Sequence, residues 1–198
     1  MNRLSDESLD LIFRKARSQN GWLPKPVSDA QLRELYEIMK WGSTSSNSSP
    51  ARIIFLRTPA AKERVRAAMS AGNLDKTMTA PVVAIIGHDQ RFYEQLPRLF
   101  PHNPSAITWF SGEDKRPVAE ITAFRNAALQ GAYLMIAARA IGLDCGPMSG
   151  FDNARVDAEF FAGTSIRSNF ICNLGYGDAS KVYGRSPRLS FEEACTLL

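Results

Sequence analysis

The sequence predicts a single-domain α+β protein in which a small central mixed sheet is covered by helices. Three observations lead to this prediction. Helical periodicity dominates the chain, only three segments have the apolar, β-branched composition of strands, and these strands do not alternate regularly with the helices. The length of 198 residues suits one domain. No linker, internal repeat or low-complexity tract divides residues 1–198.

Two helices are expected in the first quarter of the chain. Ser5 has the side chain of an N-cap for a helix from Asp6 to about Arg17. Ser28 and Gln31 form a capping-box pattern at the start of a second helix, which ends near Gly42. The apolar residues of this second helix recur at helical spacing and are expected in the core: Leu32, Leu35 and Met39.

Three strands and one helix are expected next. Residues Arg52 to Arg57 and Asn169 to Leu174 have strand composition. The continuous apolar run from Val82 to Ile86 predicts a strand buried on both faces. Between the first two strands, Ala60 to Met69 has a helical pattern.

The longest helix is expected from Ala119 to Ile141, with Gly142 as its stop. It is apolar on more than one face, which is typical of a helix at the centre of a bundle or a dimer. A short helix from Asn153 to Phe161 and a last helix after Ser190 follow. Before the long helix, residues Gln90 to Pro117 are interrupted by prolines and predict an irregular excursion over the surface, either a lid or a dimer arm.

Composition excludes several classes of protein. The net charge of +4 is carried by scattered residues, so nucleic-acid binding is not expected. Three cysteines without CxxC spacing and only two histidines argue against a disulfide framework, a zinc site or a histidine-based triad. The polar N-terminus is no signal peptide, and no long apolar run predicts a membrane span. We therefore expect a cytoplasmic protein.

Two clusters near the chain ends have the chemistry of a phosphate site. Arg17, Ser18 and Asn20 combine a guanidinium fork with smaller polar groups, and Arg185 with Arg188 could form a second clamp. The alternative is a solvated basic helix end and a solvated loop.

Two further clusters are polar. Ser45, Ser46 and Asn47 lie in a loop that could bind a polar heteroaromatic ring, or could be a flexible surface loop. Asn73 and Lys76 are three residues apart and share a helical face, which could equally be an ordinary exposed turn.

Two glycine-rich segments complete the candidates. The segment Gly142 to Asp152 can bring its backbone close to a flat ligand, or can be a structural turn. Cys145 and Ser149 lack the pattern of a nucleophile, because no GxSxG elbow is present. Residues Gly175 to Ser180 resemble half of a dinucleotide fingerprint, but position 180 is not glycine, so a Rossmann domain is not expected.

Taken in order, these motifs resemble those of the nitroreductase-like FMN-dependent oxidoreductases over essentially the whole chain. The ordered set is Arg17-Ser18, Ser45-Ser46-Asn47 with Pro50, Asn73-x-x-Lys76, Pro147-Met148-Ser149-Gly150-Phe151 and Arg188. More narrowly, the stretches TAFRN, GPMSGFD and PRLSFEEAC are similar to the malonic semialdehyde reductase subgroup of the uracil-degrading Rut pathway.

The resemblance implies a homodimer with FMN at its interface and sites shared by the two subunits. Arg17, Ser18 and Arg188 would contact the FMN phosphate, and Asn20 belongs to the same cluster. Asn73 and Lys76 would reach the ribityl and pyrimidine edge, where a lysine stabilises the anionic reduced ring. The partner would supply Ser45, Ser46 and Asn47. The turn would lie on the flavin face: Pro147, Met148, Ser149 and Gly150.

The resemblance also implies a ping-pong reaction in which NADH or NADPH reduces the flavin and a small-molecule acceptor then takes the hydride. Flavin N5 carries the hydride, so no side chain has a covalent role. The chain has Ala16 where a basic residue is common, Ser49-Pro50-Ala51 in place of Gln-Pro-Trp, and Ser149 in place of an acidic residue. These differences favour reduction of malonic semialdehyde to 3-hydroxypropanoate. A broad nitro- or quinone reductase and a non-catalytic flavin-binding module are the alternatives.

Overall fold

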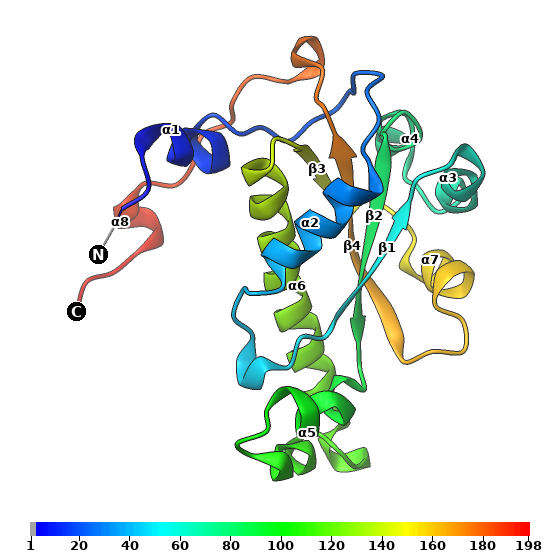
Figure 1. Cartoon of the computed structure of the whole chain (residues 1–198), viewed down its shortest axis with the longest axis vertical. Helices are drawn as coiled ribbons and strands as arrows, with labels where there is room; N and C mark the ends of the chain where they lie inside the picture. Colours follow the sequence, from blue (N-terminus) through cyan, green and yellow to red (C-terminus); the bar gives the residue numbers. More distant parts are fainter. Residues whose placement is uncertain (1–2) are drawn as a thin grey trace.

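The computed structural model describes residues 3–198 and contains a four-stranded sheet in the order β1-β2-β4-β3. Its strands are β1 (Ala51–Leu56), β2 (Val82–Asp89), β3 (Asp144–Met148) and β4 (Ile166–Gly175). Helices cover both faces of the sheet (Figure 1). On one side lie α2 (Asp29–Met39) and α6 (Arg116–Ala140), and on the other lie α3 (Pro59–Arg66), α4 (Ala71–Met78) and α7 (Asn153–Phe160).

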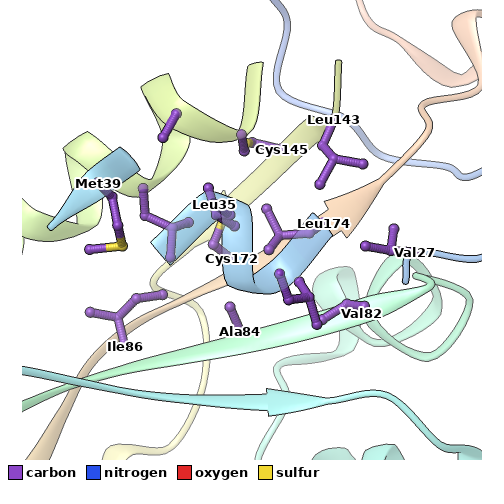
Figure 2. Packing of buried hydrophobic residues seen from close by; sticks show 14 residues of the cluster. Val27, Leu35, Met39, Val82, Ala84, Ile86, Leu143, Cys145, Cys172 and Leu174 are labelled. Carbon is purple, nitrogen blue, oxygen red and sulfur yellow. The ribbon is translucent and has the colours of Figure 1, made fainter. Parts of the chain in front are cut away.

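The core consists of two layers because successive side chains of β2 point to opposite faces of the sheet. Val82, Ala84 and Ile86 pack with residues of α2 and α6, as Figure 2 shows. Val83 and Ile85 pack into a second cluster that contains residues of α3 and α7. All five side chains are at most 1% exposed, which confirms the prediction of a strand buried on both faces.

The second helix is confirmed in detail. Ser28 caps α2 by accepting a hydrogen bond from the Gln31 N–H, and the Gln31 side chain accepts one from the Ser28 N–H in return. The expected core residues Leu32, Leu35 and Met39 are buried. Local capping and tertiary burial therefore agree in this helix.

The first helix is shorter than predicted. Ser5 is its N-cap, as expected, and α1 (Asp6–Leu9) continues into the π-helical turn η1 (Asp10–Arg14). The helix stops before Arg17 because the following segment pairs with the sheet: Ser18 forms a bridge with Cys145, and the Gln19 N–H donates to the Cys145 carbonyl at 2.9 Å.

Two features of the sheet differ from the prediction. Its three strand pairs are all antiparallel, so the sheet is not mixed, although the α+β class is confirmed. Strand β3 was expected to be part of a turn. Its Gly146 and Pro147 have low strand propensity, but Pro147 is tolerated because β3 lies at the sheet edge.

The Gln90 to Pro117 excursion is made of short helical pieces. They are η3 (Phe92–Gln95), α5 (Leu96–Leu99), η4 (Pro104–Trp109) and η5 (Glu113–Lys115). Phe92, Leu96 and Phe110 form a small separate core with the first turns of α6. Helix α6 begins at Arg116, earlier than predicted, since Pro117 is tolerated in a first helical turn.

The two chain ends lie beside each other, away from the sheet (Figure 1). After β4, the chain forms the turn η6 (Ala179–Lys181) and an extended segment that ends with α8 (Phe191–Ala194), whose predicted capping box at Ser190 is present. Residues 183–198 are exposed throughout. Within residues 3–198, no helix has both the length and the apolar character needed to cross a membrane.

Candidate functional site

A basic cavity of about 390 Å³ lies between the two chain ends. No Asp or Glu side chain lines it. Its lining includes four guanidinium groups and two smaller polar side chains: Arg17, Arg139, Arg185, Arg188, Ser18 and Asn20. This arrangement suits an anion with several oxygens, because guanidinium groups bind phosphate or carboxylate oxygens in a planar fork.

Hydrogen bonds hold the two chain ends together around this cavity. The Arg17 side chain donates to the Tyr183 carbonyl, and Arg185 Nη2 donates to the Arg14 carbonyl at 2.7 Å. Arg188 donates only to its neighbours, the carbonyls of Ser186 and Pro187. The structure therefore brings the N-terminal and C-terminal phosphate-site candidates into one cavity.

Lys76 joins the basic cavity to helix α4. Its ammonium Nζ donates to Asn20 Oδ1 at 3.3 Å. Lys76 is half-buried and forms no salt bridge with a carboxylate among residues 3–198. Its charge is therefore free to act on a ligand that lies beside Asn20.

The turn after β3 lies directly against α4. Asn73 Nδ2 donates to the Gly150 carbonyl at 2.9 Å, and the Ser70 N–H donates to the same oxygen at 3.1 Å. A Cβ atom on Gly150 would lie 2.5 Å from Asn73 Nδ2, so only glycine leaves room for this contact. Ser149 is exposed at this turn, whereas Met148 is buried and accepts a hydrogen bond from Thr77 Oγ1.

The turn and α4 thus extend the surface that begins at the basic cavity. Three predicted sets from distant parts of the sequence lie side by side: Arg17, Ser18 and Asn20, then Asn73 and Lys76, then Pro147 to Gly150. Arg188 completes the cavity at one end. Hydrogen bonds from Lys76 to Asn20 and from Asn73 to Gly150 therefore bring these motifs close together.

The Ser45–Asn47 loop (η2) is not part of this surface in the single chain. The Ser45 N–H donates to Asn126 Oδ1 on α6 at 2.8 Å, and Asn47 Nδ2 donates to the Leu99 carbonyl at 2.8 Å. Arg139, which lines the basic cavity, is thirteen residues further along α6, about 20 Å at the helical rise. Figure 1 shows the loop and residues 17–20 well apart.

The loop itself is held in an uncommon conformation. Ser46, Asn47 and Ser49 have positive φ angles of 51°, 48° and 41°. Non-glycine residues adopt this region rarely, and runs of them are found mainly where a loop has a functional constraint. The loop is thus ordered by α6 and α5 and is not a flexible surface segment.

Arg139 was not predicted as a site residue. It is the single charged side chain between Asn126 and Ala140, and this isolated charge in an apolar helix was the available signal. Its Nη1 donates to the Ile12 carbonyl at 3.0 Å, which places the guanidinium beside the N-terminal helix. Arg139 therefore links the longest helix to the basic cavity.

Two of the three cysteines, Cys145 and Cys172, are buried. Cys145 is fully buried, and its Sγ lies 3.7 Å from the Met135 carbonyl. A hydrogen bond with the Cys145 thiol, together with burial, raises the pKa of Cys172 well above its usual range. Neither of these two thiols is exposed, as a reactive nucleophile is.

Comparison with known proteins identifies the family. The Nitroreductase family matches residues 14–176. A protein of Cupriavidus pinatubonensis, named as an NADH dehydrogenase/NAD(P)H nitroreductase, is 65% identical over 193 residues and covers 98% of each chain.

Solved structures with low sequence identity share the fold. The nitroreductase ydfN of Bacillus subtilis has a TM-score of 0.87 at 20% identity, covering 97% of this chain and 99% of that chain. A nitroreductase of Exiguobacterium sibiricum, solved in complex with FMN, has a TM-score of 0.80 at 14% identity and full coverage of both chains. The chain therefore belongs to the Nitroreductase family of FMN-dependent, NAD(P)H-oxidising enzymes.

Proposed function

We propose that the protein reduces malonic semialdehyde to 3-hydroxypropanoate, using FMN bound at a site shared by two subunits and NADH or NADPH as electron donor. The observation that supports the site best is the series of contacts from Asn20 in the basic cavity, through Lys76 and Asn73 on α4, to Gly150. It offers cations at one end, an uncompensated ammonium in the middle and a close backbone turn at the other end.

The residues present fit FMN in chemistry and order. Arg17, Ser18 and Arg188 would hold the phosphate, with Arg139 as a further cation. Asn20, Asn73 and Lys76 would contact the ribityl chain and the pyrimidine edge. The segment from Pro147 to Gly150, which runs from the end of β3 into the following turn, would cover one face of the ring, where the glycine allows close approach. Bound FMN supplies hydride transfer at N5, from reduced nicotinamide to the acceptor.

The role of Lys76 is electrostatic in this proposal. Reduction leaves negative charge on the pyrimidine side of the flavin, and a nearby ammonium stabilises that charge. Lys76 has no carboxylate partner within residues 3–198, so its charge is not already neutralised. The net reaction adds a hydride and a proton to the aldehyde carbon and oxygen, and it requires no side-chain nucleophile.

A homodimer would complete the site. Ser45, Ser46 and Asn47 lie apart from the other flavin-contact residues in one chain, and a second copy could bring its own loop to them. Exposed apolar side chains support such a dimer. On α6 they form a stripe, Val118, Ile121 and Leu129, and on the terminal segments they are Phe13, Tyr183, Leu189 and Phe191.

The choice of acceptor rests on the sequence. The stretches TAFRN, GPMSGFD and PRLSFEEAC are similar to malonic semialdehyde reductases, and Ser149 stands where nitroreductases often have an acidic residue. The second candidate is a broad nitro- or quinone reductase. It is favoured by the name of the Cupriavidus relative, an NAD(P)H nitroreductase at 65% identity.

The first experiment is the colour of the purified protein and its binding of added FMN. We expect a yellow protein that oxidises NADH or NADPH. The second experiment compares kcat/KM for malonic semialdehyde, a nitroaromatic compound and a quinone, each corrected for oxidation by oxygen alone. The aldehyde is expected to give the highest efficiency.

Three outcomes contradict the proposal at different levels. A colourless protein that binds no added FMN removes the flavin site altogether. Bound FMN without turnover by either nicotinamide leaves a non-catalytic flavin-binding module. Turnover with a nitroaromatic or quinone, but no acceleration by the aldehyde, makes the second candidate correct.

A further inference from the structure

The backbone carbonyl of Lys76 is the starting point of this inference. Lys76 lies in the last turn of α4, where carbonyls lack helical partners. The Ala80 N–H, which could have reached it in a longer helix, donates to the Thr77 carbonyl instead. Two side chains from elsewhere in the chain donate to the Lys76 oxygen: Trp22 Nε1 at 2.8 Å and Asn173 Nδ2 at 2.9 Å.

Both donors are themselves fixed by packing. Gly146 and Gly175 make room for the Trp22 ring, since a Cβ atom on either would lie 3.1 and 3.0 Å from the indole. Asn173 is fully buried on β4. The two donors reach Lys76 from different elements, one from the segment after Asn20 and one from the sheet.

The hydrogen bond from Asn173 to the Lys76 carbonyl comes with a cost in stability. The Asn173 Oδ1 is buried and has no hydrogen-bond partner within the described chain. An unpartnered buried acceptor destabilises a fold, so an apolar residue of the same shape would be tolerated or even preferred for stability alone. The amide at this position is therefore best explained by what its Nδ2 group holds.

We propose that Trp22 and Asn173 are positioning residues for flavin reduction. By holding the Lys76 carbonyl from two sides, they fix the backbone from which the Lys76 ammonium reaches the ligand. This proposal rests on the proposed function, in which that ammonium stabilises reduced FMN. A charge held in place before reduction stabilises the product more than one that must reorganise.

The test measures the midpoint potential of bound FMN in Trp22→Phe and Asn173→Leu. Both changes keep most of the side-chain volume and remove the donor. We expect reduced FMN to bind about three- to tenfold more weakly relative to oxidised FMN, which lowers a two-electron potential by roughly 15–30 mV. Trp41→Phe is the matched control, because Trp41 is 81% exposed and its Nε1 has no hydrogen-bond partner within residues 3–198.

Two further measurements separate positioning from a purely structural role. Asn173→Leu should lower the potential without lowering the melting temperature, because it also removes the unpartnered Oδ1. In a Lys76→Ala background, Trp22→Phe should produce no further shift, since its effect passes through Lys76. If Trp22→Phe does not fold, Asn173→Leu in both backgrounds provides the same comparison.

The outcomes that overturn the proposal are distinct from failure of the proposed function. Unchanged potentials in both variants, or an equal shift with and without Lys76, would remove the positioning role while wild-type FMN binding and turnover stand. A wild-type protein that binds no FMN would remove the proposed function first. A shift in the FMN potential that appears only in variants with a lowered melting temperature, and in proportion to that lowering, would mean that the two residues have only a structural role.

Discussion

Two polar regions of the molecule differ in how complete they are. Around α4, hydrogen bonds connect Lys76 with Asn20 and Asn173 and connect Asn73 with Gly150, so three other segments of the chain contact this helix. The Ser45–Asn47 loop is equally well ordered, but its bonds run to α6 and α5, and no other predicted flavin contact lies beside it. In the proposed function, one chain would supply most of a flavin site, and its Ser45–Asn47 loop would complete the site of a second copy.

Mixing two defective variants tests this comparison most directly. One variant is Arg17→Glu, which reverses a charge in the basic cavity. The other replaces Ser45, Ser46 and Asn47 by glycine, which allows positive φ and removes the side chains. If each site takes residues from both subunits, unfolding and refolding a mixture should restore activity from background to about a quarter of wild type, because mixed dimers contain one intact site.

The control for this experiment is each variant refolded alone, which should stay at background activity. Activity that fails to rise above the two separate variants would mean that the loop serves the site of its own chain. In that case the loop would have to move within its own subunit to reach the other predicted flavin contacts.

The next largest effect is expected for Arg17→Ala. Loss of a charge-assisted hydrogen bond to phosphate should weaken FMN binding by about 1.5–3 kcal/mol, roughly ten- to 150-fold in Kd. Fluorescence quenching of FMN on titration with protein measures this. Arg14→Ala is the control, since Arg14 pairs with Asp6 and Asp10 and does not line the cavity. Equal losses in both variants would indicate a general effect of charge.

A smaller effect is expected at Gly150. An added Cβ would displace Asn73 and weaken FMN binding by about one hydrogen bond, roughly 0.5–1.5 kcal/mol. Gly72→Ala is the matched control on α4, because nothing lies within 4 Å of its added Cβ. It should stabilise the fold by about 0.5–1 kcal/mol and leave Kd unchanged. Unaltered FMN binding in Gly150→Ala would argue against close contact at the turn.

The smallest expected effect is a pH dependence of stability that arises from His88. This residue lies near the end of β2, where it pairs with Ala51 at the start of β1, just after the Ser45–Asn47 loop. Burial lowers the pKa of His88, and the Asp157 carboxylate opposes this effect in part. Above the unfolded value of about 6.5 both states are neutral. As the pH drops below this value, the unfolded chain binds the proton before the folded chain does. The free energy of unfolding should therefore decrease as the pH decreases.

Urea unfolding at pH 7.5 and pH 5.5 measures this dependence. His88→Gln should lose the part of the pH dependence that His88 carries, and His102→Gln is the control at the second histidine. If His88→Gln and wild type lose the same stability on acidification, other groups dominate. The protonation of His88 would then make no measurable contribution to the stability of the region around the loop.

Elements with strong local signals could be predicted from the sequence. Helix α2 has a capping box and a regular apolar face, and β2 has an uninterrupted apolar run, so local preference and burial agree. Strand β3 could not be predicted, because five residues containing glycine and proline form a strand only through pairing with β4. A bridge between Ser18 and Cys145 of β3 explains why the first helix ends at Arg14.

The site was predictable as an ordered set of short motifs, and the resemblance to a family depended on that order. Its connections were not predictable. Contacts such as Lys76 with Asn20 and Asn73 with Gly150 join residues far apart in sequence, and no local pattern encodes them. Arg139 and the two donors to the Lys76 carbonyl were missed for the same reason, since each acts across elements.

The basic cavity has a consequence for the order in which the protein is made. Its lining comes from residues 13–20, Arg139 and residues 183–188, so the last of these segments is translated after the others. A chain that ends before Tyr183 lacks Arg185 and Arg188, which are two of the four guanidinium groups of the cavity. A phosphate-bearing ligand that binds there would therefore discriminate against chains that lack residues 183–188, and the fraction of chains that bind it would report how many contain this segment.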